Sequence, residues 1–259
     1  MPRIHETAIV SPEAEIDDTV AVGPGAIIEG PCRIGAGTII GPRAYIGPHT
    51  TIGRDNQIHI GAVIGHVPQD YHYQGGVTEC RIGDRNTIRE YAQIHRSSQE
   101  GAATVVGSDC FLMACSHVGH DCRVGDHVIM ANGVLLAGHV TLSDRVFLSG
   151  NVVVHQFVRV GTLVMVGGGS RTIQDVPPYM MLVGNNTIVS INTVGLTRAG
   201  FDADARRRVK RAYKLLYRSG LTFPQALDRI EADLGESPEI RDLLAFCRAD
   251  SQRGLARHA

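Results

Sequence analysis

The sequence predicts an all-β left-handed parallel β-helix followed by a small α-helical domain. Three observations support this prediction. Aliphatic residues recur every six positions, glycine is abundant at 30 of 259 residues, and aromatic residues make up only 5% with no tryptophan. A narrow, repetitive interior built from small aliphatic side chains explains this composition better than a compact mixed core does.

The six-residue period covers most of the chain. Counting by six from Ile4 to Val166 samples 28 positions, and 25 of them are Ile, Val, Leu or Met. The exceptions are Asp70, Gly76 and Glu100, which indicate two interruptions at about 66–80 and 96–105. One short strand and one turn per six residues, with three such units to a coil, give a triangular prism of 18-residue coils that stack at the strand spacing. About 25 units give some eight coils.

Two further positions follow each aliphatic residue in the repeat. The next residue is often Gly, which we expect to serve the turn by accepting a positive φ. Four residues after the aliphatic comes a small or β-branched residue, as in Ala26, Thr38, Cys110 and Ser116. The prism is predicted to occupy residues 1–191.

From residue 192 the period changes, and 192–259 are predicted to form a small helical domain. Asp202 is a candidate N-cap for a helix through Tyr217, with Gly220 as its stop. Thr222 with Pro224 opens a second helix. Ser237 with Pro238 opens a third, expected to run to about Arg253. These helices would also cover the open strand edges at the end of the prism.

Composition excludes several classes of function. The net charge of −1 gives no global sign of nucleic-acid or membrane-surface binding, and no apolar run is long enough to be inserted in a membrane. The six cysteines show no CxxC pair and are expected to be reduced, which favours a cytoplasmic protein.

An edge of the prism gathers polar residues. The repeat is unbroken from 106 to 171, so residues 18 apart should lie in neighbouring coils. His120, Gly138 and Gln156 then form one column, with Asp121 and His139 in the adjacent one and His117 and His155 close by. This set suits acyl transfer, with His120 as general base, Asp121 orienting its ring and the Gly138 N–H facing an oxyanion. Two alternatives remain open: a zinc-dependent hydrase in which three histidines bind the metal, and a scaffold without catalysis.

At these residues the chain resembles the UDP-N-acetylglucosamine O-acyltransferase family. The motifs that carry the resemblance are IGDRNTIRE at 82–90, HVGHDCRVG at 117–125, LAGHV at 136–140, VHQF at 154–157, MVGGGS at 165–170, QDVPPY at 174–179 and AYKLLYRSG at 212–220. The resemblance implies transfer of a (3R)-3-hydroxyacyl group from acyl carrier protein to the 3-hydroxyl of UDP-N-acetylglucosamine, the first step of lipid A biosynthesis. It also implies a homotrimer with sites between subunits, no metal and no cofactor.

The resemblance assigns roles to individual residues. His120, Asp121 and Gly138 are expected to be catalytic, and Gly168 is expected to set a long acyl chain of the 3-hydroxytetradecanoyl class. Binding of the substrates is expected of Asp70, His72, His117, His139, His155, Gln156, Asn192 and Arg198. Docking of the acidic carrier protein is expected of Arg206, Arg207, Arg208, Lys210, Arg211, Lys214 and Arg218.

Two positions depart from the family pattern. His72 stands where the family usually has Lys, and Val194 stands where Glu is expected. Both lie near the nucleotide-sugar site in the family. A related acceptor, such as a UDP-2,3-diamino sugar on which the same base would drive amide formation, therefore remains an alternative.

Overall fold

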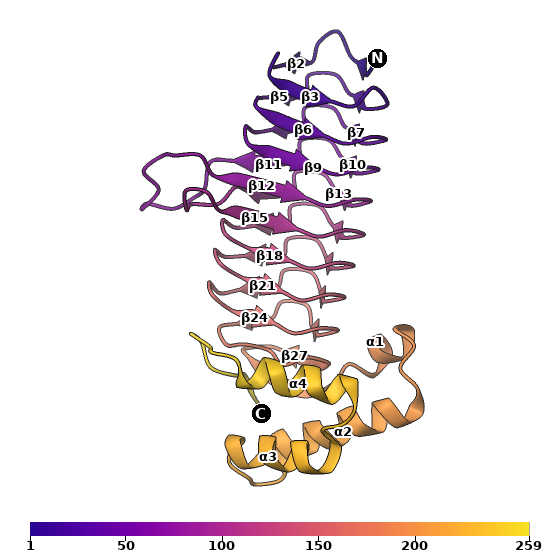
Figure 1. Ribbon diagram of the computed structural model, residues 1–259, viewed down its shortest axis with the longest axis vertical. Coiled ribbons are helices and arrows are strands. Elements are labelled where there is room, and N and C mark those ends of the chain that lie inside the picture. The colour runs from indigo at the N-terminus through magenta and orange to yellow at the C-terminus, as the bar shows by residue number, and fades with distance from the viewer. Residues whose placement is uncertain (259) are drawn as a thin grey trace.

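The computed structural model describes residues 1–258 as a triangular prism of three parallel sheets with helices at its C-terminal end (Figure 1). The parallel strands of the first sheet, sheet A, are β1 Arg3–Ile4, β4 Ala21–Val22, β7 Ile39–Ile40, β10 Gln57–Ile58, β13 Thr87–Ile88, β16 Phe111–Leu112, β19 Ile129–Met130, β22 Phe147–Leu148, β25 Met165–Val166 and β27 Met180–Val183. Sheet B comprises β2 Ile9–Val10, β5 Ile27–Ile28, β8 Tyr45–Ile46, β11 Val63–His66, β14 Gln93–His95, β17 His117–Val118, β20 Leu135–Leu136, β23 Val153–Val154 and β26 Arg171–Thr172. Sheet C comprises β3 Ala14–Ile16, β6 Cys32–Ile34, β9 Thr50–Ile52, β12 Glu79–Ile82, β15 Ala103–Val106, β18 Arg123–Val124, β21 Thr141–Leu142 and β24 Arg159–Val160.

The strand register confirms the predicted 18-residue coil. Ile4 pairs with Val22, and His117 pairs with Leu135. Two coils are longer, because Gln57 pairs with Thr87 and Thr87 with Phe111, giving 30 and 24 residues. The extra residues leave the prism between β11 and β12 and between β14 and β15, and the first of these loops projects from its side (Figure 1). Sheet A holds ten parallel strands, so the estimate of some eight coils was too low. It counted only the 25 matching units, whereas nine of these strands lie between Ile4 and Val166 and β27 adds the tenth.

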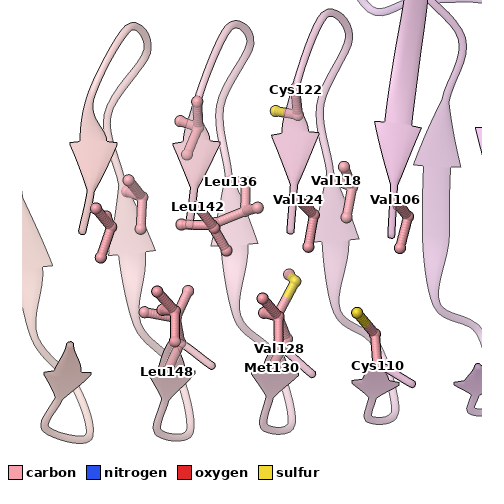
Figure 2. Close-up of a cluster of buried hydrophobic side chains, with 14 of the residues drawn as sticks. Val106, Cys110, Val118, Cys122, Val124, Val128, Met130, Leu136, Leu142 and Leu148 are labelled. Atoms are coloured by element: carbon pink, nitrogen blue, oxygen red, sulfur yellow. The ribbon is translucent and has the colours of Figure 1, made fainter. Parts of the chain in front are cut away.

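The predicted inward positions form the core. Every aliphatic residue of the period from Val22 to Val166 is buried. The small residue four places later is buried as well, as in Ala26, Thr38 and Cys110, except at Ser98 in the second loop, which is partly exposed. Figure 2 shows these side chains in successive coils, with Val118, Val124 and Leu136 directed into the interior. Burial of the same few side-chain types in each coil supplies the hydrophobic stabilisation of the prism.

The prediction that the repeat glycines adopt a positive φ was wrong. With the exception of Gly65, the glycines that follow the aliphatic position from Gly23 to Gly167 do not have positive φ. They are required because neighbouring coils approach closely: a Cβ on Gly35 would lie 2.8 Å from the carbonyl carbon of Gly53. The left-handed residue is instead the third after the aliphatic, and it is usually not glycine, as at Asp121 and His139.

The C-terminal region closes the end of the prism. β27 forms an antiparallel hairpin with β28 Thr187–Ile191, and β29 Arg257–His258 adds to β28. The helices are α1 Thr193–Arg198, α2 Ala203–Arg218, α3 Phe223–Leu234 and α4 Pro238–Arg248. Asp202, Thr222 and Ser237 are the N-caps of α2, α3 and α4, as predicted. The helices of residues 1–258 include none long and apolar enough to cross a membrane.

Two details of this region differ from the sequence prediction. α4 ends at Arg248 rather than near Arg253, because Ala249 is extended and the Ser251 hydroxyl accepts hydrogen bonds from the N–H groups of Arg253 and Gly254 to form a turn. That turn directs the chain back to the prism as β29. Neither β29 nor the six-residue α1 was predicted, since both are short and depend on tertiary contacts.

A buried ion pair joins the helices to the last coils. The carboxylate of Asp175, 1% exposed, accepts hydrogen bonds from the backbone N–H of Arg159 at 2.8 Å and from its Nε at 2.7 Å. The Arg159 guanidinium also lies over the ring of Phe246 on α4 and reaches the carbonyl oxygen of Ala249. The hydroxyl of Tyr179 donates to Asp242 of α4 at 2.7 Å.

We predict that Asp175→Ala lowers the free energy of unfolding by about 3–5 kcal/mol, because Arg159 is left as a largely buried charge without its partner. Urea denaturation followed by circular dichroism measures this change. Arg33→Ala removes the exposed Arg33–Glu15 pair and serves as control, with no measurable effect expected. Equal stability of the two variants would contradict the role of Asp175 at the junction.

Candidate active site

The corner between sheets B and C holds the residues that the sequence predicted to be catalytic. His120 and Asp121 lie in the turn between β17 and β18, two and three residues after the buried Val118. Asp121 has a φ of 61°, in the left-handed region. The turn brings these sequence neighbours together, with Nδ1 of His120 2.8 Å from Oδ2 of Asp121. Their side chains are only 14% and 8% exposed.

The next coil completes this corner. A Cβ on Gly138 would lie 2.5 Å from Nε2 of His120, so only glycine allows the two turns to stack with the ring between them. The N–H of Gly138 donates to no group within residues 1–258 and is free to receive an acceptor. His139 lies above Asp121 as predicted, with its Nε2 3.6 Å from Oδ2 of Asp121 and its ring stacked on Phe157.

The Asp121 carboxylate receives further hydrogen bonds from the second loop. The hydroxyl of Ser97 donates to Oδ1, and the hydroxyl of Ser98 donates to Oδ2 at 2.7 Å. Burial acts to raise the pKa of Asp121, but the hydrogen bonds from His120, Ser97 and Ser98 outweigh it and hold this pKa well below its usual range. Asp121 is therefore a carboxylate able to stabilise a protonated His120.

This donor set fits acid–base chemistry better than metal binding. His120, Asp121 and His139 each offer an atom within 4.8 Å of the others, the spacing of a cation site. A cation there would have to displace the Nδ1 proton of His120 and compete with the two serine hydroxyls for the carboxylate. The hydrogen bonds instead fix the proton of His120 on Nδ1 and leave Nε2 as the basic atom.

The first loop also reaches this corner. The carboxylate of Asp70 accepts hydrogen bonds from the backbone N–H of His72 at 2.9 Å and from its Nδ1 at 3.1 Å. The backbone hydrogen bond, with a smaller contribution from the charge of His120, lowers the pKa of Asp70. The His72 side chain is 96% exposed, and the hydrogen bonds that join His72 to the rest of residues 1–258 go to Asp70.

His117 lies on the outer face of sheet B rather than at the corner. Its ring is 5.2 Å from that of His95, which is in turn 6.2 Å from that of His66. Nε2 of His117 is buried and has no hydrogen-bond partner among residues 1–258. Burial, with the proximity of His95, lowers the pKa of His117 to about 4. His66 and His95 were not predicted because each lies beside a loop that interrupts the repeat.

The remaining predicted residues are spread over other parts of the prism. His155 and Gln156 lie one coil beyond Gly138, and within residues 1–258 no hydrogen bond joins their side chains to His120 or Asp121. Gly168 lies at the corner between sheets A and B, where an added Cβ would make only ordinary contacts of 3.5 Å and 3.8 Å. Arg253, which was not predicted, donates to the carbonyl oxygen of Gln156 at 2.8 Å.

Asn192 and Arg198 line a groove on the outer face of sheet A. The groove has a volume of about 660 Å³, and its lining also includes Val194, Phe147 and Met165. Asn192 caps α1, because its Oδ1 accepts from the N–H of Gly195 and its Nδ2 donates to the carbonyl of Leu163. Sheet A does not border the corner between sheets B and C. A single chain therefore does not bring this groove and His120 together.

The predicted carrier-binding residues lie on or beside α2, and several already have partners. Arg208 contacts Glu239 at 2.6 Å, Arg211 contacts Asp233 at 2.6 Å, and Arg207 contacts Asp204. Arg206 donates to Thr197, and the Arg218 guanidinium lies over the ring of Tyr213. Lys210 and Lys214 are exposed, and no ion pair within residues 1–258 involves them.

A hexapeptide prism with a buried His–Asp pair at a corner and a free glycine N–H beside it defines a hexapeptide acyltransferase. Comparisons with known proteins agree. The bacterial transferase hexapeptide profile matches residues 13–48 and 103–138, and the profile described as Udp N-acetylglucosamine O-acyltransferase, domain 2, matches residues 175–256. The chain is 48% identical to the acyl-[acyl-carrier-protein]–UDP-N-acetylglucosamine O-acyltransferase of Burkholderia lata, over 99% of this chain and all of the relative.

Further relatives and solved structures give the same result. The protein of the same name from Halorhodospira halophila is 46% identical over 99% of this chain and all of its own length. The UDP-N-acetylglucosamine acyltransferase structure from Francisella novicida has a TM-score of 0.94 and 38% identity, covering 98% of this chain and 94% of that one. The corresponding structure from Moraxella catarrhalis has a TM-score of 0.94 and 39% identity, covering 98% and 99%. The chain belongs to the UDP-N-acetylglucosamine O-acyltransferase family.

The low pKa of His117 predicts a pH dependence of stability. In the unfolded chain His117 binds a proton near pH 6.5, but in the folded protein only near pH 4, so the unfolded state binds more protons between these values. Stability should therefore fall as the pH is lowered through this window. In His117→Gln we expect the decrease in the free energy of unfolding over this pH range to be smaller by about 2 kcal/mol.

Urea midpoints between pH 4.5 and 8 measure this difference. His5→Gln changes an exposed histidine on the first coil and is the control. A wild-type stability that does not change between pH 6.5 and 4.5, or a His117→Gln profile parallel to that of the wild type, would contradict the prediction.

Proposed function

We propose that this protein transfers a (3R)-3-hydroxyacyl chain from acyl carrier protein to the 3-hydroxyl of UDP-N-acetylglucosamine, the first step of lipid A biosynthesis. The observation that supports this most directly is the His120–Asp121 pair, with Nε2 free beside the N–H of Gly138. The pair lies in a chain whose relatives in Burkholderia lata and Halorhodospira halophila bear the name of that reaction.

The geometry supports a two-stage acyl transfer. Nε2 of His120 accepts the proton of the sugar hydroxyl, and the oxygen of that hydroxyl attacks the thioester carbonyl carbon. The carbonyl oxygen gains negative charge and accepts a hydrogen bond from the N–H of Gly138. The carbon–sulfur bond then breaks, and the leaving thiolate of the carrier takes the proton from His120. Asp121 stabilises the imidazolium between these two stages.

The site is proposed to lie between subunits of a homotrimer. Asn192 and Arg198 border the groove on sheet A, whereas His120 lies at the opposite corner of the same prism. Contact between the sheet A groove of one subunit and the corner of the next would bring Asn192 and Arg198 of one chain close to His120 of the other. Asp70 on the projecting first loop, with His139, His155 and Gln156, would then complete the pocket for the nucleotide sugar.

The acceptor is assigned as UDP-N-acetylglucosamine, with a UDP-2,3-diamino sugar as the alternative. His72 is exposed and already bound to Asp70, so it is a weaker donor to a ligand than a lysine would be. Val194 is 61% exposed at the groove and offers no hydrogen bond. The mass of the product distinguishes an ester from an amide.

The carrier protein is proposed to approach α2. Because Arg207, Arg208 and Arg211 already contact acidic residues of this chain, we expect Lys210 and Lys214, which are exposed and enter no ion pair within residues 1–258, to contribute most to attraction of the carrier. An acidic carrier would be steered to this side by long-range attraction. The carrier supplies the thioester itself, so the reaction calls for no further cofactor. The reduced cysteines are in keeping with a cytoplasmic enzyme.

The experiment that tests this function is acyl transfer by purified protein, with 3-hydroxyacyl carrier proteins of several chain lengths, UDP-N-acetylglucosamine as acceptor, and the product identified by mass. We expect His120→Ala to lower kcat by about 10²- to 10⁴-fold, because the hydroxyl loses its general base. His5→Ala, an exposed histidine on the first coil, is the matched control and should retain full activity.

The alternatives predict other outcomes. A zinc-dependent enzyme would lose activity on treatment with a chelator and regain it with Zn²⁺. A non-catalytic scaffold would show no transfer, and His120→Ala would alter at most ligand binding. Transfer only to the diamino sugar would reassign the acceptor.

Gly168→Met is expected to shift the preferred acyl chain to shorter lengths. The position has room for a side chain, since an added Cβ meets nothing closer than 3.5 Å, so the fold should tolerate the change. Each methylene excluded from an apolar groove costs about 0.8 kcal/mol, or roughly fourfold in affinity. Comparison of kcat/KM across chain lengths measures the shift. Gly169→Ala at the next residue, which has a φ of +66°, would strain the turn without blocking a groove and should leave the preference unchanged.

A further inference from the structure

The second loop of the prism brings two serines onto the carboxylate of Asp121. The Ser97 hydroxyl donates to Oδ1, while the Ser98 hydroxyl donates to Oδ2 at 2.7 Å and its N–H lies 3.2 Å from the same atom. Ser97 is fully buried. These serines lie between β14 and β15, in the segment that makes this coil six residues longer than the standard coil of 18.

The same segment also fixes the backbone of Asp121. Its N–H donates to the hydroxyl of Thr104 at 2.8 Å, at the start of β15. The left-handed φ of Asp121 itself comes from the repeat, which has such a residue at the same place in other turns. Ser97, Ser98 and Thr104 therefore add contacts that hold the backbone and the carboxylate of Asp121 in one orientation.

We propose that Ser97 and Ser98 are positioning residues of the reaction, which clamp the Asp121 carboxylate against Nδ1 of His120. This inference rests on the proposed role of His120 as the base. The clamp is needed because His120 must keep its proton on Nδ1 to present Nε2 to the substrate. A carboxylate that rotated away would release the ring to the other tautomer.

The clamp also keeps the carboxylate charged. Burial alone would raise the pKa of Asp121, and the serine hydrogen bonds act against it. The titratable groups that face this carboxylate are His120, His139 and Cys122, while Asp70 faces His120 from the first loop. Loss of the serine donors should raise the pKa of Asp121, so that the carboxylate is protonated at a higher pH. The acidic limb of the rate profile should therefore move to higher pH.

The test compares Ser97→Ala, Ser98→Ala and the double variant with the wild type in the acyl-transfer assay. We expect kcat to fall about tenfold for each hydroxyl removed and about a hundredfold for both, with KM within about twofold. The acidic limb of the kcat profile should move to higher pH. Ser98→Thr keeps the hydroxyl and should restore most of the activity, and Gln99→Ala changes an exposed neighbour in the same loop as the matched control.

A substrate-free measurement separates this inference from the proposed function. Imidazole ¹⁵N NMR of the protein reports the tautomer and titration of His120, with His120→Ala identifying its signals. A clamp predicts a changed His120 tautomer or titration midpoint in the serine variants and none in Gln99→Ala. If the double variant does not fold, the single variants carry the test.

The outcomes are distinct. Variants with wild-type kcat, or with a kcat lowered equally at every pH and an unchanged NMR titration, would overturn the clamp and leave the acyl transfer standing. A wild-type protein inactive with every acyl chain and both acceptors would overturn the proposed function, and the NMR titration would still decide whether the serines control His120.

Discussion

The structure depends on how closely successive coils can stack. Each coil lies directly on the next, so the interior admits one aliphatic and one small residue per side, and the turn admits no Cβ where backbones meet, as at Gly35. This constraint fixes the strands and leaves the corners as the places where side chains can vary. The chemistry of the protein is therefore found at corners and in the loops that leave them.

The corner between sheets B and C shows how this freedom is used. Its turn places consecutive residues within hydrogen-bond distance, which a regular helix or strand would not do for His120 and Asp121. The next coil adds Gly138 at the distance set by strand spacing, and His139 follows above Asp121. A rigid stack therefore holds His120 and the N–H of Gly138, the proposed base and oxyanion donor, in a fixed relation without a dedicated loop for either.

The repeat explains why so much was predictable. Counting by six located the inward residues, and counting by 18 placed Gly138 over His120, because an unbroken solenoid converts sequence separation directly into distance. The same arithmetic fails inside the loops, so Ser97, Ser98 and His95 were missed although they contact or adjoin predicted residues. It also fails for Asn192 and Arg198, which lie beyond the unbroken repeat and line a groove on sheet A, a face that does not border the His120 corner. The prediction of a positive φ at the repeat glycines was wrong because the close contact that requires them is made with the next coil, and the sequence of a single repeat does not show that contact.

The lengths of the two loops keep the phase of the repeat. The longer coils hold 30 and 24 residues instead of 18, so both exceed the standard coil by whole multiples of six. The chain therefore returns from each loop with its aliphatic residues still directed inward, as at Ile82 and Val106. Loops of such lengths add Asp70 and the pair Ser97–Ser98 to the surroundings of His120 without changing the stacking of the coils on either side.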